Sequence, residues 1–230
     1  MTNTKDILEY LADLAQNNNR DWYHANKDRY IKANAEFECV ISELITAIGA
    51  FDGRIINNPP KNLTFKMVRD IRYSFDKSPY NPVFRAHISS IGKLPIPVGY
   101  YILIAPENRS FLGGGLFASM FKDATRMVRD YIAANGKEFE AIINNKDFSD
   151  RFTVKGEALK NIPRGYDADN PQAGYLRYKS WYLEYPVSDE QVADADEFIK
   201  EAAQVFRYMK PFNDYLNSAL REFRMPTRGF

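Results

Sequence analysis

The sequence predicts an α+β fold in which a mostly antiparallel central sheet packs with N-terminal and C-terminal helices. Apolar residues recur at helical spacing near both ends of the 230-residue chain. Between residues 53 and 117, prolines alternate with short aromatic and β-branched runs, which is typical of strands and loops. The connections between these runs are too short for a crossover helix, so antiparallel pairing is favoured. The length suits a single domain over residues 1–230.

The N-terminal part reads as two helices. The first covers residues 4–16, and the three asparagines at 17–19 end it. The second begins near Asp21 and continues to Gly49, because apolar residues keep a period of about 3.6 along it.

The middle of the chain supplies the strands. The clearest is 99–106, GYYILIAP, which Gly99 and Pro106 bound. Shorter candidates are 63–68, 84–90 and 109–114, and the last can form a hairpin with the clearest strand across Pro-Glu-Asn.

The C-terminal part returns to helical periodicity. Helices are expected from Phe117 to about Ile132 and again near 139–143. An irregular stretch follows around a possible strand at 175–185. One face of this strand is polar and basic and could contact a partner; the alternative is an edge strand that its charges protect from pairing. Ser188 and Gln191 then form a capping-box pattern that opens a long helix, which Pro211 breaks or kinks.

Composition excludes several function classes. The 31 basic and 30 acidic side chains give a net charge of +1, so we expect nucleic acid to be an unlikely partner and no membrane binding. The single cysteine, Cys39, fits a reducing, cytoplasmic location, and no signal peptide or long apolar run is seen. His24 and His87 lie in no metal-ligand spacing, so neither a metal nor another cofactor is expected.

The densest chemical pattern is RDIRYSFDKSPYNP at 69–82. In an extended segment Asp70 and Arg72 share a face, and a turn places Lys77 and Tyr80 at a rim. Guanidinium forks and an ammonium recognise carboxylate or phosphate, which predicts an anion-binding loop. The alternative is an ion-pair network that fixes a long loop. Residue types alone favour this alternative, because structural networks gather the same residues: Arg69, Asp70, Arg72 and Asp76.

A second candidate is FLGGGLFASMF at 111–121, with a glycine-rich turn at Gly113, Gly114 and Gly115 between a strand and a helix. Its backbone amides could approach an anion closely, and if they face the 69–80 segment the two would form one pocket. The alternative is a sterically required turn, and the spacing matches no nucleotide-binding fingerprint.

The segment NNNRDWYHANKDRY at 17–30 provides secondary candidates in Arg20, Trp22 and Lys27. These side chains could wall a binding site. A more common role for such a segment is to cap a helix and staple it onto the core.

The chain resembles an uncharacterised family, domain of unknown function number 2461. The resemblance is carried by NNNRDWYHANKDRY, FKMVRDIRYSFDKSPYNP and GYYILIAPENRSFLGGGLF, in that order. It implies a bacterial-type soluble protein without an evident cofactor and supplies no activity. The family pattern points to Asn19, Arg20, Trp22, Lys27, Arg69, Asp70, Arg72, Asp76, Lys77, Pro79, Tyr80, Gly113, Gly114 and Gly115.

Two functions follow as hypotheses. In the first, a soluble protein binds a small anionic ligand through Arg69, Arg72 and Lys77, near the glycines, with Asp70 or Asp76 as orienting group or general base. Catalysis is left open, since no nucleophile can be named. In the alternative, the chain is a non-enzymatic interaction module for protein or single-stranded nucleic acid. Under a third, purely structural reading, the motif only staples the fold.

Overall fold

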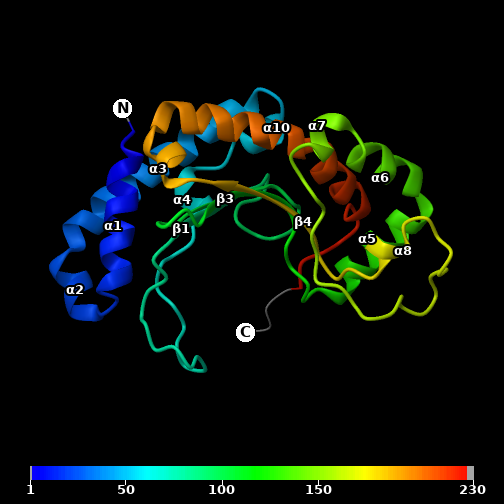
Figure 1. Cartoon of the computed structure of the whole chain (residues 1–230), viewed down its shortest axis with the longest axis horizontal. Helices are drawn as coiled ribbons and strands as arrows, with labels where there is room; N and C mark the ends of the chain where they lie inside the picture. The colour runs from blue at the N-terminus through cyan, green and yellow to red at the C-terminus, as the bar shows by residue number, and fades with distance from the viewer. Residues whose placement is uncertain (1, 227–230) are drawn as a thin grey trace. The chain divides into compact units, whose positions relative to one another are not determined.

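The computed structural model describes residues 2–226 as an α+β fold (Figure 1). Within these residues, four antiparallel strands form one sheet in the order β1-β2-β3-β4. The fold-class prediction is therefore confirmed, and so is the hairpin across residues 106–108, because β2 and β3 are neighbours. The strands are β1 (Phe84–Ile88), β2 (Tyr100–Ile104), β3 (Ser110–Leu116) and β4 (Trp181–Val187).

In the sequence, helices precede β1, lie between β3 and β4, and follow β4. No helix among residues 2–226 combines the length and apolar character needed to cross a membrane. The helices are α1 (Thr4–Gln16), α2 (Arg20–Ala25), α3 (Lys27–Gly49), the 3-10 turn η1 (Gly53–Ile55), α4 (Pro60–Leu63), α5 (Lys122–Ala134), α6 (Gly136–Ile143), α7 (Lys146–Ser149), α8 (Ala173–Leu176), α9 (Asp189–Ala193) and α10 (Ala195–Ala219).

The contacts divide the chain into two compact units, and each is described by itself. The single domain over residues 1–230 therefore stays a prediction. The first unit comprises residues 1–93, 101–112 and 186–207, and the second comprises residues 94–100, 113–185 and 208–230.

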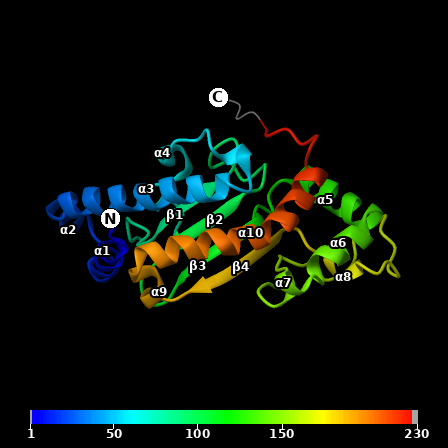
Figure 2. The same ribbon diagram turned by 90° about the horizontal axis from the view of Figure 1, so that it is seen from above.

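In the first unit, α1 packs along α3. The apolar residues of α1, such as Ile7 and Leu11, are buried, and Asn3 caps the helix by accepting the Asp6 N–H at 3.2 Å. Helix α3 covers one face of the sheet, since the ring of Phe37 stacks on Phe84 of β1 at 5.3 Å (Figure 2). Burial of these apolar faces supplies the main stabilisation of the unit.

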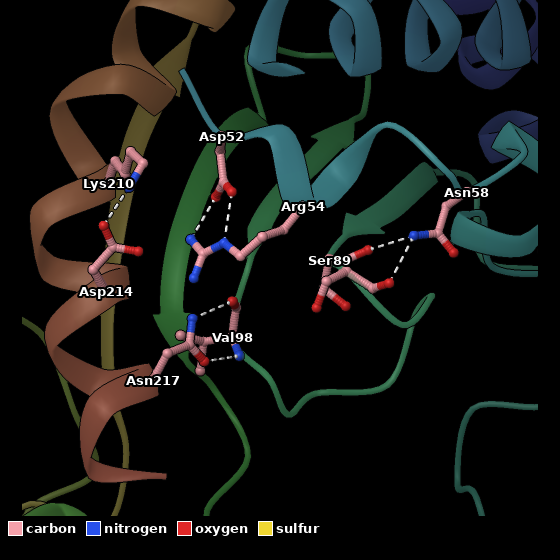
Figure 3. Close-up of polar contacts among 9 residues, drawn as sticks. Asp52, Arg54, Asn58, Ser89, Val98, Lys210, Asp214 and Asn217 are labelled. Carbon is pink, nitrogen blue, oxygen red and sulfur yellow. Dashed lines mark hydrogen bonds and ion pairs between the residues drawn. The ribbon is translucent and has the colours of Figure 1, made fainter. Parts of the chain in front are cut away.

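The segment after α3 is fixed by partly buried polar contacts (Figure 3). Asp52 is 5% exposed and accepts two hydrogen bonds from Arg54, each of 2.7 Å. Further along, the Asn58 amide donates to the carbonyls of Ser89 and Ser90 at 3.0 Å each. Side chains thus satisfy backbone groups that a loop leaves without ladder partners.

In the second unit, the C-terminal half of α10 packs against α6 through aromatic rings. Phe139 lies 5.4 Å from Tyr215 and 6.3 Å from Phe212. Of the break or kink expected at Pro211, the break does not occur, because α10 continues through the proline as far as Ala219. Buried aromatic side chains on both sides of the proline hold the adjoining turns in place.

Several predicted elements differ from the structure: the capping box at Ser188 opens the short helix α9 and not the long helix α10, and the strand expected at 175–185 begins only at Trp181. The helix expected from Asp21 to Gly49 is divided at Asn26, whose side chain donates to the Trp22 carbonyl at 2.9 Å and so ends α2. Residues 63–68 form only two isolated bridges, to Ala86 and to Tyr80. The predicted helix at Phe117 begins five residues later, at Lys122.

Candidate functional site

The most distinctive motif folds into a long loop, residues 69–80, that extends away from the sheet (Figure 1). Its base is closed by an antiparallel bridge between Val68 and Tyr80 and by a 3.0 Å hydrogen bond from the Arg69 N–H to the Pro79 carbonyl. The Asn18 side chain holds Tyr80 through both backbone groups, at 2.9 and 3.2 Å. The base of the loop is therefore tied to the segment between α1 and α2 of the first unit.

Tyr80 is 6% exposed, and its ring stacks on Tyr23 at 4.2 Å. The sequence placed Tyr80 at the rim of a binding site. Its ring lies instead among the aromatic side chains beneath the loop, where it anchors the returning strand of the loop.

The carboxylate of Asp70 pairs with Arg72 in a fork. The Arg72 Nε and Nη2 atoms donate to it at 2.9 and 2.6 Å, and the Arg72 backbone N–H donates at 3.2 Å. These hydrogen bonds from Arg72 lower the pKa of Asp70. Both side chains are largely exposed, at 76% for Arg72 and 59% for Asp70, so the pair lies at the surface.

A second pair spans the loop. Arg69 donates to Asp76 in a close ion pair and to Ser74 at 3.4 Å, while Asp76 accepts the Ser78 N–H at 2.8 Å. The hydrogen bond from Arg69 is the main cause that holds the pKa of Asp76 well below its usual value. Lys77 donates to the Ile71 carbonyl at 3.1 Å. All three cations that the sequence assigned to an anion thus have partners within the loop.

The loop also presents two aromatic rings to solvent. Tyr73 and Phe75 are 96% and 104% exposed relative to their reference areas. The Arg72 guanidinium lies 6.0 Å from the centroid of the Tyr73 ring. Apolar groups that are exposed side by side, unlike scattered single ones, mark interaction sites on folded proteins.

The glycine-rich turn predicted at residues 113–115 is wrong, because Gly113, Gly114 and Gly115 lie inside strand β3 and are buried. Helix α10 explains the glycines: a Cβ on Gly114 would lie 3.0 Å from Met209 Sδ and from Asn213 Oδ1. Gly115 has φ +90° and donates its N–H to Asn213 at 2.7 Å. Side chains of α10 therefore contact the backbone that was expected to bind an anion. The anion pocket shared with the 69–80 segment stays a prediction.

The secondary candidates lie at the start of α2 and α3. Arg20 and Lys27 are exposed, whereas the Trp22 ring lies 6.0 Å from the ring of Tyr10. Asn19 caps α2 by accepting the Trp22 N–H at 2.9 Å. Trp22 therefore staples the helix onto the core.

Sequence reasoning missed a row of side chains on the sheet of the first unit. Arg85 of β1 lies over the Phe65 ring at 5.0 Å, and Tyr101 of β2 stacks with Phe111 of β3 at 5.6 Å. The signal was present in the sequence as alternate polar or aromatic positions along neighbouring strands. Each of the four side chains is half-buried.

The fold and these sites define an α+β protein whose chemistry-bearing groups lie on an exposed loop and a sheet face, with no group of three His, Cys, Asp or Glu among residues 2–226 placed to hold a metal. The chain belongs to the family described as conserved hypothetical protein, DUF2461, whose sequence model matches residues 6–215. The expected resemblance is confirmed. Searches of curated proteins and of solved structures returned no match.

Proposed function

We propose that this protein is a non-enzymatic interaction module that binds a protein partner through the 69–80 loop. The observation that carries the proposal is the full exposure of Tyr73 and Phe75 on a loop whose charges are paired internally. Tyrosine and arginine are enriched among the residues that dominate protein interfaces. We further propose a cytoplasmic site of action, where the exposed thiol of Cys39 stays reduced.

The rings supply the binding energy in this proposal. Each aromatic side chain buries roughly 150–250 Å² when it is covered. At about 25 cal/mol per Å², covering Tyr73 and Phe75 provides roughly 8–12 kcal/mol before the costs of association are subtracted. That amount is sufficient for a specific complex of moderate affinity.

The ion pairs lower those costs. Asp70 and Asp76 each accept a backbone N–H two residues ahead, which fixes two turns on either side of the rings. A loop that is ordered before it binds loses less conformational entropy in the complex. The same pairs count against a small anionic ligand, which would have to compete with a carboxylate already bound to Arg72.

A photo-crosslinking amino acid at position 73 tests the proposal in the cells that make this protein, with Ile31 of α3, 53% exposed, as the control site. We expect one discrete protein adduct at position 73 and none at position 31. With that partner purified, Tyr73→Ser together with Phe75→Ser should weaken binding at least about 30-fold, which corresponds to roughly 2 kcal/mol, the loss of a single hot-spot residue. Identical adducts at both sites, or unchanged affinity, would overturn the proposal.

A small anionic ligand is the second candidate, because the Arg72 guanidinium is 76% exposed and Lys77 is exposed beside it. Thermal unfolding with phosphate, carboxylates and nucleotides, on wild type and on Arg72→Ala, separates the two functions. Stabilisation that Arg72→Ala abolishes would favour the anion site. The interaction module predicts no such stabilisation.

A further inference from the structure

We infer that the open sheet face of the first unit binds single-stranded nucleic acid. The binding surface is the aromatic row, defined as Phe65, Arg85, Tyr101 and Phe111, together with Lys93. It contains no residue of the 69–80 loop, so it is independent of the function proposed above.

The row crosses the sheet without interruption. The Phe65 N–H donates to the Arg85 carbonyl at 3.0 Å, and the Arg85 guanidinium lies 5.0 Å from the Phe65 ring centroid. On its other side, Arg85 hydrogen-bonds to Tyr101. The Tyr101 and Phe111 rings then stack at 5.6 Å with an interplanar angle of 28°. One guanidinium thus lies between the rings of two neighbouring segments, and the Tyr101–Phe111 pair extends the row to a third.

This face is the one turned away from helix α3. Phe84 points into the core against Phe37 of α3, so its neighbour Arg85 points to the opposite face. The burial pattern agrees: along β2, Tyr101 is half-buried and lies between Tyr100 and Ile102, which are buried. The edges and partial faces of the row are therefore accessible to solvent.

The segments that carry the row are rich in basic side chains and poor in acidic ones. Between residues 81 and 106 the sequence has two cations, Arg85 and Lys93, and no Asp or Glu. Lys93 is exposed, with its ammonium 5.8 Å from the Phe65 ring and 3.0 Å from the Thr64 carbonyl. Lys61 and Lys66 are also exposed on the segment that carries Phe65.

The net charge of +1 conceals this concentration. From residue 52 to residue 122 there are ten basic side chains and four acidic ones. Each of the four carboxylates lies within 4 Å of an arginine of its own segment: Asp52 with Arg54, Asp70 with Arg72, Asp76 with Arg69, and Glu107 with Arg109. Phosphates on this face would therefore meet cations with few competing carboxylates.

Single-stranded nucleic acid is the polyanion that uses both features. Its unpaired bases can stack on aromatic rings, and its phosphates can contact Arg85 and the lysines. In a duplex the base faces are stacked on one another, so they gain nothing from the rings. An acidic polypeptide would use the cations and leave the rings without a stacking partner.

The test is fluorescence anisotropy of the full chain with a labelled 12-nucleotide single strand of mixed sequence, as RNA and as DNA, at low salt. The variants are Tyr101→Leu with Phe111→Leu, which keeps apolar volume and removes stacking, and Lys93→Ala. The matched controls are Tyr208→Leu, a half-buried tyrosine with Arg151 over its ring at 4.0 Å, and Lys137→Ala, an exposed lysine of α6.

We expect the double leucine variant to bind at least about tenfold more weakly, since stacking contributes roughly 1–3 kcal/mol per base. Lys93→Ala should reduce the slope of log K against log salt by about 0.7, the value for one phosphate contact on a single strand. The two controls should bind as the wild type does. Lys93 is a surface residue, so its variant tests the inference even if the double variant does not fold.

Three outcomes would overturn the inference. The first is no binding of either strand at low salt. The second is equal affinity for a duplex of the same sequence, or equal displacement by polyglutamate, because the surface would then recognise charge alone. The third is equal loss of binding in Lys137→Ala and Lys93→Ala.

Discussion

Replacing Gly115 by alanine tests whether the glycines of β3 serve the packing of the second unit. Gly115 has φ +90°, a conformation that an L-residue rarely adopts. A Cβ added there would lie 2.4 Å from the Trp181 carbonyl oxygen and 2.9 Å from the Phe212 ring. The carbonyl belongs to the neighbouring strand, so it cannot move without displacing β4.

The expected cost combines two effects. The left-handed conformation costs alanine about 1–2 kcal/mol. Overpacking against a strand that cannot move costs about 1–3 kcal/mol more. Gly115→Ala should therefore lower the free energy of unfolding by about 2–5 kcal/mol. Gly114→Ala should cost less, since the Met209 side chain that its Cβ meets is flexible.

Gly174→Ala is the control, because an added Cβ there has no described atom within 4 Å and the residue is helical. It should be neutral or stabilising by about 0.4–1 kcal/mol. The chain has one tryptophan in each unit, so Trp181 fluorescence in a Trp22→Phe background reports unfolding of the second unit during a urea titration. Equal midpoints for Gly115→Ala and Gly174→Ala would refute the steric argument.

Asn213→Leu should cost about 2–4 kcal/mol in the same titration, because the buried Gly115 N–H and Gly99 carbonyl lose their 2.7 and 3.0 Å hydrogen bonds. Tyr10→Phe should be neutral or stabilising by up to about 1 kcal/mol, since its buried hydroxyl has no hydrogen-bond partner among residues 2–226. Burial raises the pKa of Tyr23 to about 12, so its proton is lost from the unfolded chain first. Stability should be complete below pH 10 and fall between pH 10 and 12, and Tyr23→Phe should reduce that fall.

Most of the fold could be predicted because its signals are local. The helix at residues 4–16 and the capping box at Ser188 were predicted at the positions where the structure has them. The strand at 99–106 and its hairpin partner follow from a continuous aromatic and β-branched run and a short turn. The break at Asn26 could not be predicted, since the apolar stripe continues across it. The hydrogen bond from the Asn26 side chain to the Trp22 carbonyl ends α2 there.

The site depended on tertiary information that a sequence does not display. The motif 69–82 has the residue types of both an anion site and a closed network, and only geometry shows that Arg72 is bound by Asp70. The glycines illustrate the same limit. A glycine run between a strand and a helix suggests a turn, whereas the reason for it is the close approach of α10, distant in the sequence.

The two proposed surfaces differ in how their charges are arranged, and this difference yields a last prediction. In the 69–80 loop each arginine has its own carboxylate, so the loop presents rings with little net charge. On the sheet face, Arg85 and Lys93 have no carboxylate within the surrounding stretch 77–106. A higher salt concentration weakens phosphate contacts, because it screens the charges and makes the release of counterions less favourable. It has little effect on the burial of apolar surface.

Oligonucleotide binding should therefore weaken by roughly 25-fold between 50 and 500 mM salt if two phosphates are contacted, at a slope of about 0.7 for each. Binding of the protein partner identified through position 73 should change by less than about threefold over the same range, because its energy comes from Tyr73 and Phe75. Both affinities can be measured on one preparation of the full chain. Equal salt dependence would mean that one surface, with one kind of energy, accounts for both partners.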